Sequence, residues 1–459
     1  MAELLSVGLD VGTTTTQLIL SRLQVENQAS GFAVPQMEIT KREVIYSSPV
    51  HFTPLLGQDL VDADKLRTFV EAEYAAAGIL REQVDTGAII ITGETSRKEN
   101  ARAVLEALSS FAGDFVVATA GPDLESILAA NGAGAVAYSA DTGKTVLHMD
   151  IGGGTSNLAL IENGRIIRTG CLNVGGRLLK TDTAGKLTYV SPVLRELTNL
   201  RPGDYPDSAQ IAAIVQTLTQ GLEMAAGLRP ATALLDALLT REAETLWRPP
   251  DDAPVLSFSG GVADCIKADL TPGLFGDIGV ELGRAIGSSA LCRGAYILGQ
   301  HTIRATVIGA GCHSTTLSGS TVFVQNFPLP AKNLAVAAFT REQQDSLQLE
   351  EDIRQSFSRA DGPLLVLALP GYQSASYGQI SSLAQRLVKG VGNRPVCVCL
   401  EGDMAKALGQ KLCLLLPENT PCLCIDRVHL AQNSYLDIGL PVGPALPVVI
   451  KTLILSQGR

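Results

Sequence analysis

A short segment occurs twice in this chain, and the repeat constrains the fold more than any other feature. Leu9–Leu20 aligns without gaps to Met149–Leu160, with the Asp, the first Gly, one Thr and two Leu identical. In each copy an Asp ends an apolar strand, a turn rich in small residues follows, and a second strand leaves the turn. The repeat therefore predicts two similar β-hairpins that face each other around one ligand.

The turn residues indicate that this ligand carries phosphate. Gly and Thr in a tight turn expose backbone N–H groups to an anion, and the Thr hydroxyls add further donors. A single Asp-x-Gly turn also closes ordinary hairpins, but two copies in register favour nucleotide binding. The predicted phosphate-binding residues are Gly12, Thr13, Thr14 and Thr15 in the first turn, and Gly152, Gly153, Gly154 and Thr155 in the second.

The acidic residue of each copy points to a cation. Asp10 and Asp150 would repel a phosphate chain unless a positive ion lay between them. Hydrated Mg²⁺ prefers oxygen ligands and keeps several waters, so it suits two facing carboxylates. We therefore expect ATP with Mg²⁺, and Asp10 and Asp150 as both metal ligands and members of the catalytic set.

A third segment fits the same ligand. Val255–Ser259 is an expected apolar strand that meets Gly260 and Gly261 at the expected start of a helix. Paired glycines allow a flat ring such as adenine to lie against the backbone. A generic strand-to-helix turn is the alternative interpretation.

These three motifs, in this order, resemble those of the actin/Hsp70/hexokinase superfamily. The resemblance implies an α/β, ribonuclease-H-like ATPase of two lobes with the nucleotide in the cleft between them. The expected domains are residues 1–140 with the first phosphate motif, 141–300 with the second phosphate motif and the adenosine motif, and 301–459, an α/β region that completes the second lobe or forms a further domain. Strands expected at 364–369, 396–400 and 422–425 alternate with helices in this last region.

The whole chain resembles the ethanolamine ammonia-lyase reactivating factors, the EutA family, through Ile91–Ala101, Met149–Gly154 and Asn433–Gly439. This resemblance implies a chaperone that uses ATP and Mg²⁺ to release damaged cobalamin from inactivated ethanolamine ammonia-lyase, its client, so that adenosylcobalamin rebinds. It also implies a cytoplasmic location, within a bacterial microcompartment. The residues show no Asp-x-His-x-x-Gly corrinoid motif. A sugar-type kinase and an actin-like filament protein stay open as alternatives, as does a homo-oligomer.

Hydrolysis requires an acceptor that aligns water on the terminal phosphate. Glu94, after an expected strand and the flexible Gly93, is the candidate; its alternative role is an ion pair with Lys98 at a helix start. Glu125 is left unassigned, and His148, inside a strand, is expected to be a hydrogen-bonded core residue. Gly132–Ala137 matches G-x-G-x-x-A but follows a helix, so close helix packing is favoured over dinucleotide binding.

Composition excludes several classes of protein. A net charge of −10 and a pI near 5.1 disfavour nucleic acid and anionic membrane surfaces as partners. We find no signal peptide and no apolar run of about 18 residues, so no membrane span is expected. Several of the nine cysteines lie in apolar runs, which is typical of reduced, buried thiols; their spacing does not predict a zinc site.

Overall fold

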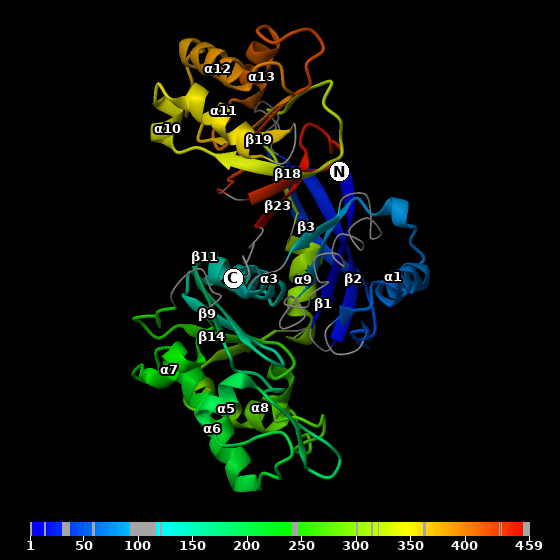
Figure 1. The fold of residues 1–459 in the computed structure, drawn as a ribbon, viewed down its shortest axis with the longest axis vertical. Coiled ribbons are helices and arrows are strands. Elements are labelled where there is room, and N and C mark those ends of the chain that lie inside the picture. Colours follow the sequence, from blue (N-terminus) through cyan, green and yellow to red (C-terminus); the bar gives the residue numbers. More distant parts are fainter. Residues whose placement is uncertain are drawn as a thin grey trace.

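The computed structural model describes residues 2–12, 15–29, 37–56, 60–91, 116–119, 122–240, 247–299, 302–313, 315–319, 321–360, 364–430, 432 and 434–452. Within these residues three large sheets follow one another along the long axis of the molecule (Figure 1). The N-terminal sheet lies between the sheet that carries the second hairpin and the C-terminal sheet. No helix in these ranges is both long enough and apolar enough to cross a bilayer.

The first sheet has the strand order β3-β2-β1-β7-β8, with β4 paired to β2. Its side chains pack against α1, which begins after the capping residue Asp62 and ends at Gly78 in the left-handed conformation. The first lobe contains β1 (Ala2–Val11), β2 (Thr15–Asn27), β3 (Met37–Ser47), β4 (His51–Phe52), β5 (Leu55–Leu56), β6 (Leu60–Val61), α1 (Ala63–Ala77), β7 (Thr86–Ile91) and β8 (Val116–Thr119).

The strands of this lobe are longer than their sequence indicates. The polar, turn-rich composition of residues 22–60 predicts short strands, for example Glu43–Tyr46, whereas β2 continues to Asn27 and β3 covers Met37–Ser47. The β3 strand is the edge of the sheet and none of its residues is fully buried. An edge strand can be polar on both faces, so its composition resembles that of a loop.

The second sheet repeats the arrangement of the first, with the order β11-β10-β9-β14-β15. In both sheets the first three strands are antiparallel and the following strand pairs in parallel with the strand that carries the repeated Asp. The second lobe contains α3 (Pro122–Gly132), α4 (Ala135–Thr142), β9 (Val146–Ile151), β10 (Ser156–Glu162), β11 (Arg165–Leu172), β14 (Val255–Ser259) and β15 (Tyr296–Leu298).

Further elements cover this sheet. The chain between β11 and β14 folds over it, and α8 follows β14. Phe258 on β14 is fully buried in the shared core. These elements are β12 (Leu179–Thr181), β13 (Leu187–Val190), α5 (Pro192–Leu197), α6 (Ser208–Ala225), α7 (Ala233–Leu238) and α8 (Gly279–Ser288).

Two helices, α3 and α9 (Ala305–His313), cross between the two sheets (Figure 1). A Cβ on Gly132 would lie 1.9 Å from the carbonyl oxygen of Ala305, and one on Gly309 would lie 2.1 Å from that of Leu128. The interpretation of Gly132 as a helix-packing glycine is therefore confirmed. Although α9 follows the second sheet in sequence, it packs on β1, β2 and β7 of the first.

The third sheet has the order β16-β23-β22-β18-β19-β20-β21-β17. Its central strands are parallel, and α11, α12 and α13 pack on one face. The strands expected at 364–369, 396–400 and 422–425 are confirmed as β19, β20 and β21, whereas the domain boundaries at residues 140 and 300 stay predictions. The elements are β16 (Thr315–Leu317), β17 (Phe323–Gln325), β18 (Ala331–Ala338), α10 (Arg341–Asp345), α11 (Leu349–Arg359), β19 (Leu365–Leu369), α12 (Tyr377–Val391), β20 (Val396–Leu400), α13 (Ala405–Cys413), β21 (Cys422–Asp426), β22 (Ser434–Ile438) and β23 (Pro447–Thr452).

Candidate nucleotide site

The two repeated hairpins have the same backbone geometry. Asp10 on β1 pairs with Gln17 on β2, and Asp150 on β9 pairs with Asn157 on β10. Each turn is closed by the same hydrogen bond, from the N–H of Gly12 to the carbonyl of Thr15 and from that of Gly152 to Thr155, both at 2.9 Å. The predicted duplication of the hairpin is confirmed.

The second turn is supported from one side and open on the other. The N–H groups of Gly176 and Arg177 donate to the carbonyls of Gly152 and Gly153 at 3.0 and 2.6 Å. A Cβ on Gly154, by contrast, would meet no atom within 4 Å. The small residue at this position is not required by packing, so it leaves room for an approaching ligand. Thr13 and Thr14 of the first turn lie outside the described residues.

The two hairpins contact the same short segment at the start of α9. The Gln17 side chain donates to the carbonyl of Ile303 at 3.3 Å, and the Thr306 hydroxyl donates to Asp150 Oδ2 at 3.3 Å. The N–H of Gly260 donates to the carbonyl of Thr302 at 2.9 Å. Residues 302–306 therefore connect both repeated hairpins with the strand end that carries Gly260.

Asp150 lies in an environment that penalises its charge. Its side chain is 9% exposed, and burial raises its pKa, while hydrogen bonds from Ser259 and Thr306 act in the opposite direction. A buried carboxylate is stabilised when a positive charge approaches it. The site is therefore better suited to a cation than to a bare phosphate.

The oxygens around the repeated acids match the preferences of Mg²⁺. Within the described residues, the amide oxygens of Gln17 and Asn157 are buried and have no hydrogen-bond partner. They belong to the residues paired with Asp10 and Asp150. No three His, Cys, Asp or Glu side chains converge in the described part of the chain, so the remaining ligands would be water and phosphate oxygens, as Mg²⁺ favours.

The two glycines of the third motif, Gly260 and Gly261, differ in how closely other atoms surround them. Gly260 has φ of 88°, and a Cβ there would lie 2.3 Å from the carbonyl oxygen of Ile151. Its small size is therefore required by β9. Among the described residues, the side chain of Ile303 alone comes as near as 4.0 Å to a Cβ on Gly261. The expected helix start is wrong: a 3-10 turn, Ala263–Cys265, follows, and α8 begins only at Gly279.

Sequence reasoning assigned no role in the site to three polar residues of this region. Ser259 and Thr306 bind the Asp150 carboxylate, and Glu125 on α3, only 8% exposed, accepts a hydrogen bond from the Asn157 amide at 3.0 Å. The sequence around these residues contains no local signal for these contacts.

Two other residues were singled out from the sequence. Glu94 lies outside the described residues, and His148 is confirmed as a hydrogen-bonded core residue. Burial lowers the pKa of His148 to about 3.

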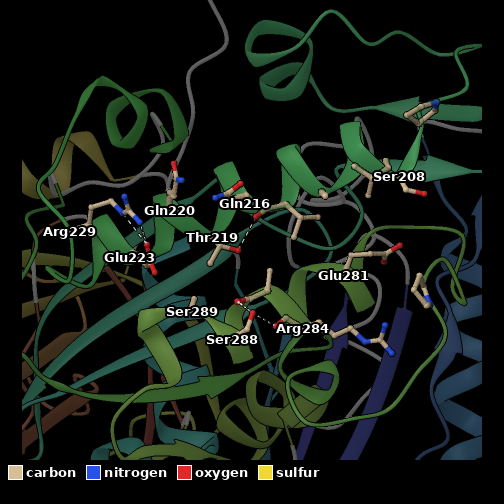
Figure 2. A pocket seen from close by; sticks show the side chains of 16 residues that line it. Ser208, Gln216, Thr219, Gln220, Glu223, Arg229, Glu281, Arg284, Ser288 and Ser289 are labelled. Atoms are coloured by element: carbon tan, nitrogen blue, oxygen red, sulfur yellow. Dashed lines mark hydrogen bonds and ion pairs between the residues drawn. The ribbon is translucent and has the colours of Figure 1, made fainter.

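A separate cavity of about 700 Å³ lies between α6 and α8 (Figure 2). Its walls combine Arg229 and Arg284 with carboxylates, hydroxyls and apolar side chains. None of the predicted phosphate-binding residues that the structure describes lines it, and neither Gly260 nor Gly261 does. The lining residues are Pro206, Ser208, Ile211, Ala212, Val215, Gln216, Thr219, Gln220, Glu223, Arg229, Pro272, Glu281, Arg284, Ala285, Ser288 and Ser289.

Two sheets of identical strand order, each with an acid-tipped hairpin, and two crossing helices define an actin/Hsp70-like protein. The chain belongs to a particular family of this class, described as "Ethanolamine utilisation protein EutA", whose sequence model matches residues 2–456. Two curated relatives, both named "Ethanolamine ammonia-lyase reactivase EutA", span 98% of this chain and 98% of their own length. The protein from Salmonella typhimurium (strain LT2) is 40% identical over 476 residues, and that from Escherichia coli (strain K12) is 39% identical over 475.

Solved structures are more distant. The Aquifex aeolicus PPX-GPPA enzyme is 10% identical, and the match covers 67% of this chain and 99% of that chain with a TM-score of 0.41. The ethanolamine utilization protein EutJ from Carboxydothermus hydrogenoformans is 16% identical, and the match covers 67% and 88% of the two chains with a TM-score of 0.34.

Proposed function

We propose that this protein is an ATP-dependent reactivase of ethanolamine ammonia-lyase, which releases damaged cobalamin from the inactivated enzyme so that adenosylcobalamin rebinds. Membership of the EutA family and the names of its relatives support the client. The single structural observation that supports the use of ATP is the pair of matching hairpins joined by residues 302–306. The proposal includes cytoplasmic action and, through ethanolamine utilisation, association with a bacterial microcompartment.

The described residues suggest how the nucleotide would be held. Asp10 and Asp150, supported by the amide oxygens of Gln17 and Asn157, would hold hydrated Mg²⁺. The ion would neutralise phosphate charge and polarise the phosphoryl oxygens when bound. The two turns would donate N–H groups to the phosphates, and the adenosine would lie beside Gly261, the more open of the paired glycines.

Work on the client requires two states of the reactivase with different affinity for the inactivated lyase. Residues 302–306 contact hairpins of both lobes, and α3 and α9 pack on each other between the two sheets, so a change at the hairpins would reach both lobes. Nucleotide bound between the hairpins would favour one lobe orientation, and hydrolysis would favour the other. Such a change of lobe orientation would alter the surface that the reactivase presents to a protein partner.

Glu125 is our candidate for the group that orients the attacking water. We expect Glu125→Gln to leave ATP binding within about twofold of wild type and to slow hydrolysis by about 100-fold, in the range of general-base losses. The Gln side chain keeps an acceptor for Asn157, so the fold is retained. Single-turnover hydrolysis and equilibrium ATP binding separate these effects. Unchanged hydrolysis would assign the role elsewhere, with Glu94 as the next candidate.

Reactivation tests the complete proposal. Ethanolamine ammonia-lyase inactivated with cyanocobalamin should recover activity when this protein, ATP, Mg²⁺ and adenosylcobalamin are added together. Omission of ATP should abolish the recovery, and a non-hydrolysable ATP analogue serves as the matched control. ATP consumption without recovery, but with a phosphorylated alcohol or sugar as product, would instead identify a kinase.

A further inference from the structure

The proposed function leaves a buried histidine beside the metal site without a role. His148 and Asp150 lie two residues apart on β9, so their side chains are on the same face of the sheet. On the parallel neighbour β14, Ser257 pairs with His148 and Ser259 pairs with Asp150. All four residues are buried, and three of them have no exposed surface at all.

Hydrogen bonds connect these side chains in series. The Ser257 hydroxyl contacts His148 Nδ1 at 3.0 Å, and His148 Nε2 contacts the Ser259 hydroxyl at 2.9 Å. Ser259 in turn donates to Asp150 Oδ1 at 2.5 Å. The series ends at a carboxylate that the proposed function assigns to Mg²⁺.

The Ser259 hydroxyl determines which atom is the donor in each hydrogen bond of this series. Ser259 has a single hydrogen, which it donates to the Asp150 carboxylate, so its oxygen must accept from His148. His148 Nε2 therefore carries the hydrogen. A neutral imidazole has only one N–H, so Nδ1 accepts from Ser257. The opposite tautomer would place a lone pair of Ser259 against Asp150 Oδ1.

We infer that His148 and Ser259 are positioning residues that hold the Asp150 carboxylate in one orientation for a divalent cation, with Ser257 fixing the imidazole. Asp150 Oδ1 accepts the 2.5 Å hydrogen bond from Ser259, whereas the one hydrogen bond that Oδ2 accepts from a described residue is the 3.3 Å contact from Thr306. Oδ2 is therefore the oxygen left for the ion. This inference rests on the proposed function in so far as the ion is the Mg²⁺ that accompanies ATP.

A pair of His148 variants separates positioning from packing. His148→Leu removes the donor to Ser259, whereas His148→Gln keeps an amide N–H beside it. We expect His148→Leu to raise the Mg²⁺ concentration that half-saturates ATP binding by about tenfold, as for other residues that orient metal ligands, and His148→Gln to stay within about threefold. Calorimetric titration of ATP at graded Mg²⁺ measures this. If both variants needed the same Mg²⁺ concentration for half-saturation, whether raised or equal to that of the wild type, the inference would be overturned.

A second measurement needs no nucleotide. The imidazole ¹⁵N spectrum of the nucleotide-free protein should show the Nε2–H tautomer for the signal that disappears in His148→Gln, one of only five histidines. An Nδ1–H tautomer would overturn the inference whatever the binding result. Failure of the wild type to bind ATP with Mg²⁺ would instead contradict the proposed function, while the tautomer still tests the order of the hydrogen bonds.

Discussion

Replacement of Asp150 by Asn is expected to weaken Mg²⁺-dependent ATP binding by about 100-fold, equivalent to about 2.7 kcal/mol. The Asn side chain has nearly the same shape and keeps an oxygen that can accept from Ser259, but it has lost the charge that attracts the ion. Burial disfavours the charged form of Asp150, so its removal should leave stability equal to wild type or slightly higher. Titration of ATP with and without Mg²⁺, together with thermal unfolding, measures both effects.

Asp426→Asn provides the matched control. Asp426 is also a buried carboxylate at a strand end, and burial is the largest cause that raises its pKa to about 6. It lies in the C-terminal sheet, away from both repeated hairpins. We expect Asp426→Asn to bind ATP with Mg²⁺ like wild type. If Asp150→Asn also bound like wild type, Asp150 would not be a metal ligand and the proposed site would be wrong.

The hairpins could be predicted because the residues that indicate them are neighbours in the sequence. Asp, Gly and Thr occur at fixed spacing in both copies, and the chemistry of a phosphate turn depends on those residue types alone. The helix Ala63–Ala77 was likewise predictable, because Asp62 at one end and Gly78 at the other provide its caps. Such features need no knowledge of distant contacts.

The residues that complete the site could not be predicted, because their contacts span long stretches of chain. Thr306 contacts a carboxylate 156 residues away, and the Gln17 amide contacts a carbonyl 286 residues away. The sequence marked Gly260 as an unusual position through its proposed contact with adenine, which stays a prediction. Its small size is explained by the backbone of Ile151, which only the folded sheet brings near. The length of the polar edge strand β3 was underestimated for a different reason: only Glu43–Tyr46 was predicted as strand, because an exposed edge strand has the composition of a loop.

Gly309→Ala is expected to lower the free energy of unfolding by about 3 kcal/mol, the upper end of overpacking penalties. The added methyl group would lie 2.1 Å from the carbonyl oxygen of Leu128 and 2.5 Å from its carbon. These are backbone atoms of α3, so no side chain can rotate away and the two helices must separate. Helix α9 also packs on β1, β2 and β7, so this displacement reaches the first hairpin.

Gly378→Ala is the matched substitution, with the opposite expected sign. Gly378 lies in the first turn of α12, and a Cβ there would meet only the Ser376 hydroxyl, at 3.9 Å. Ala is favoured over Gly in a helix by about 1 kcal/mol, so this variant should be equal to wild type or slightly more stable. Urea denaturation of both variants measures the contrast. Equal urea midpoints for the two variants would show that α3 and α9 are not in close contact. The placement of residues 302–306 between the two hairpins, which depends on that contact, would then be wrong.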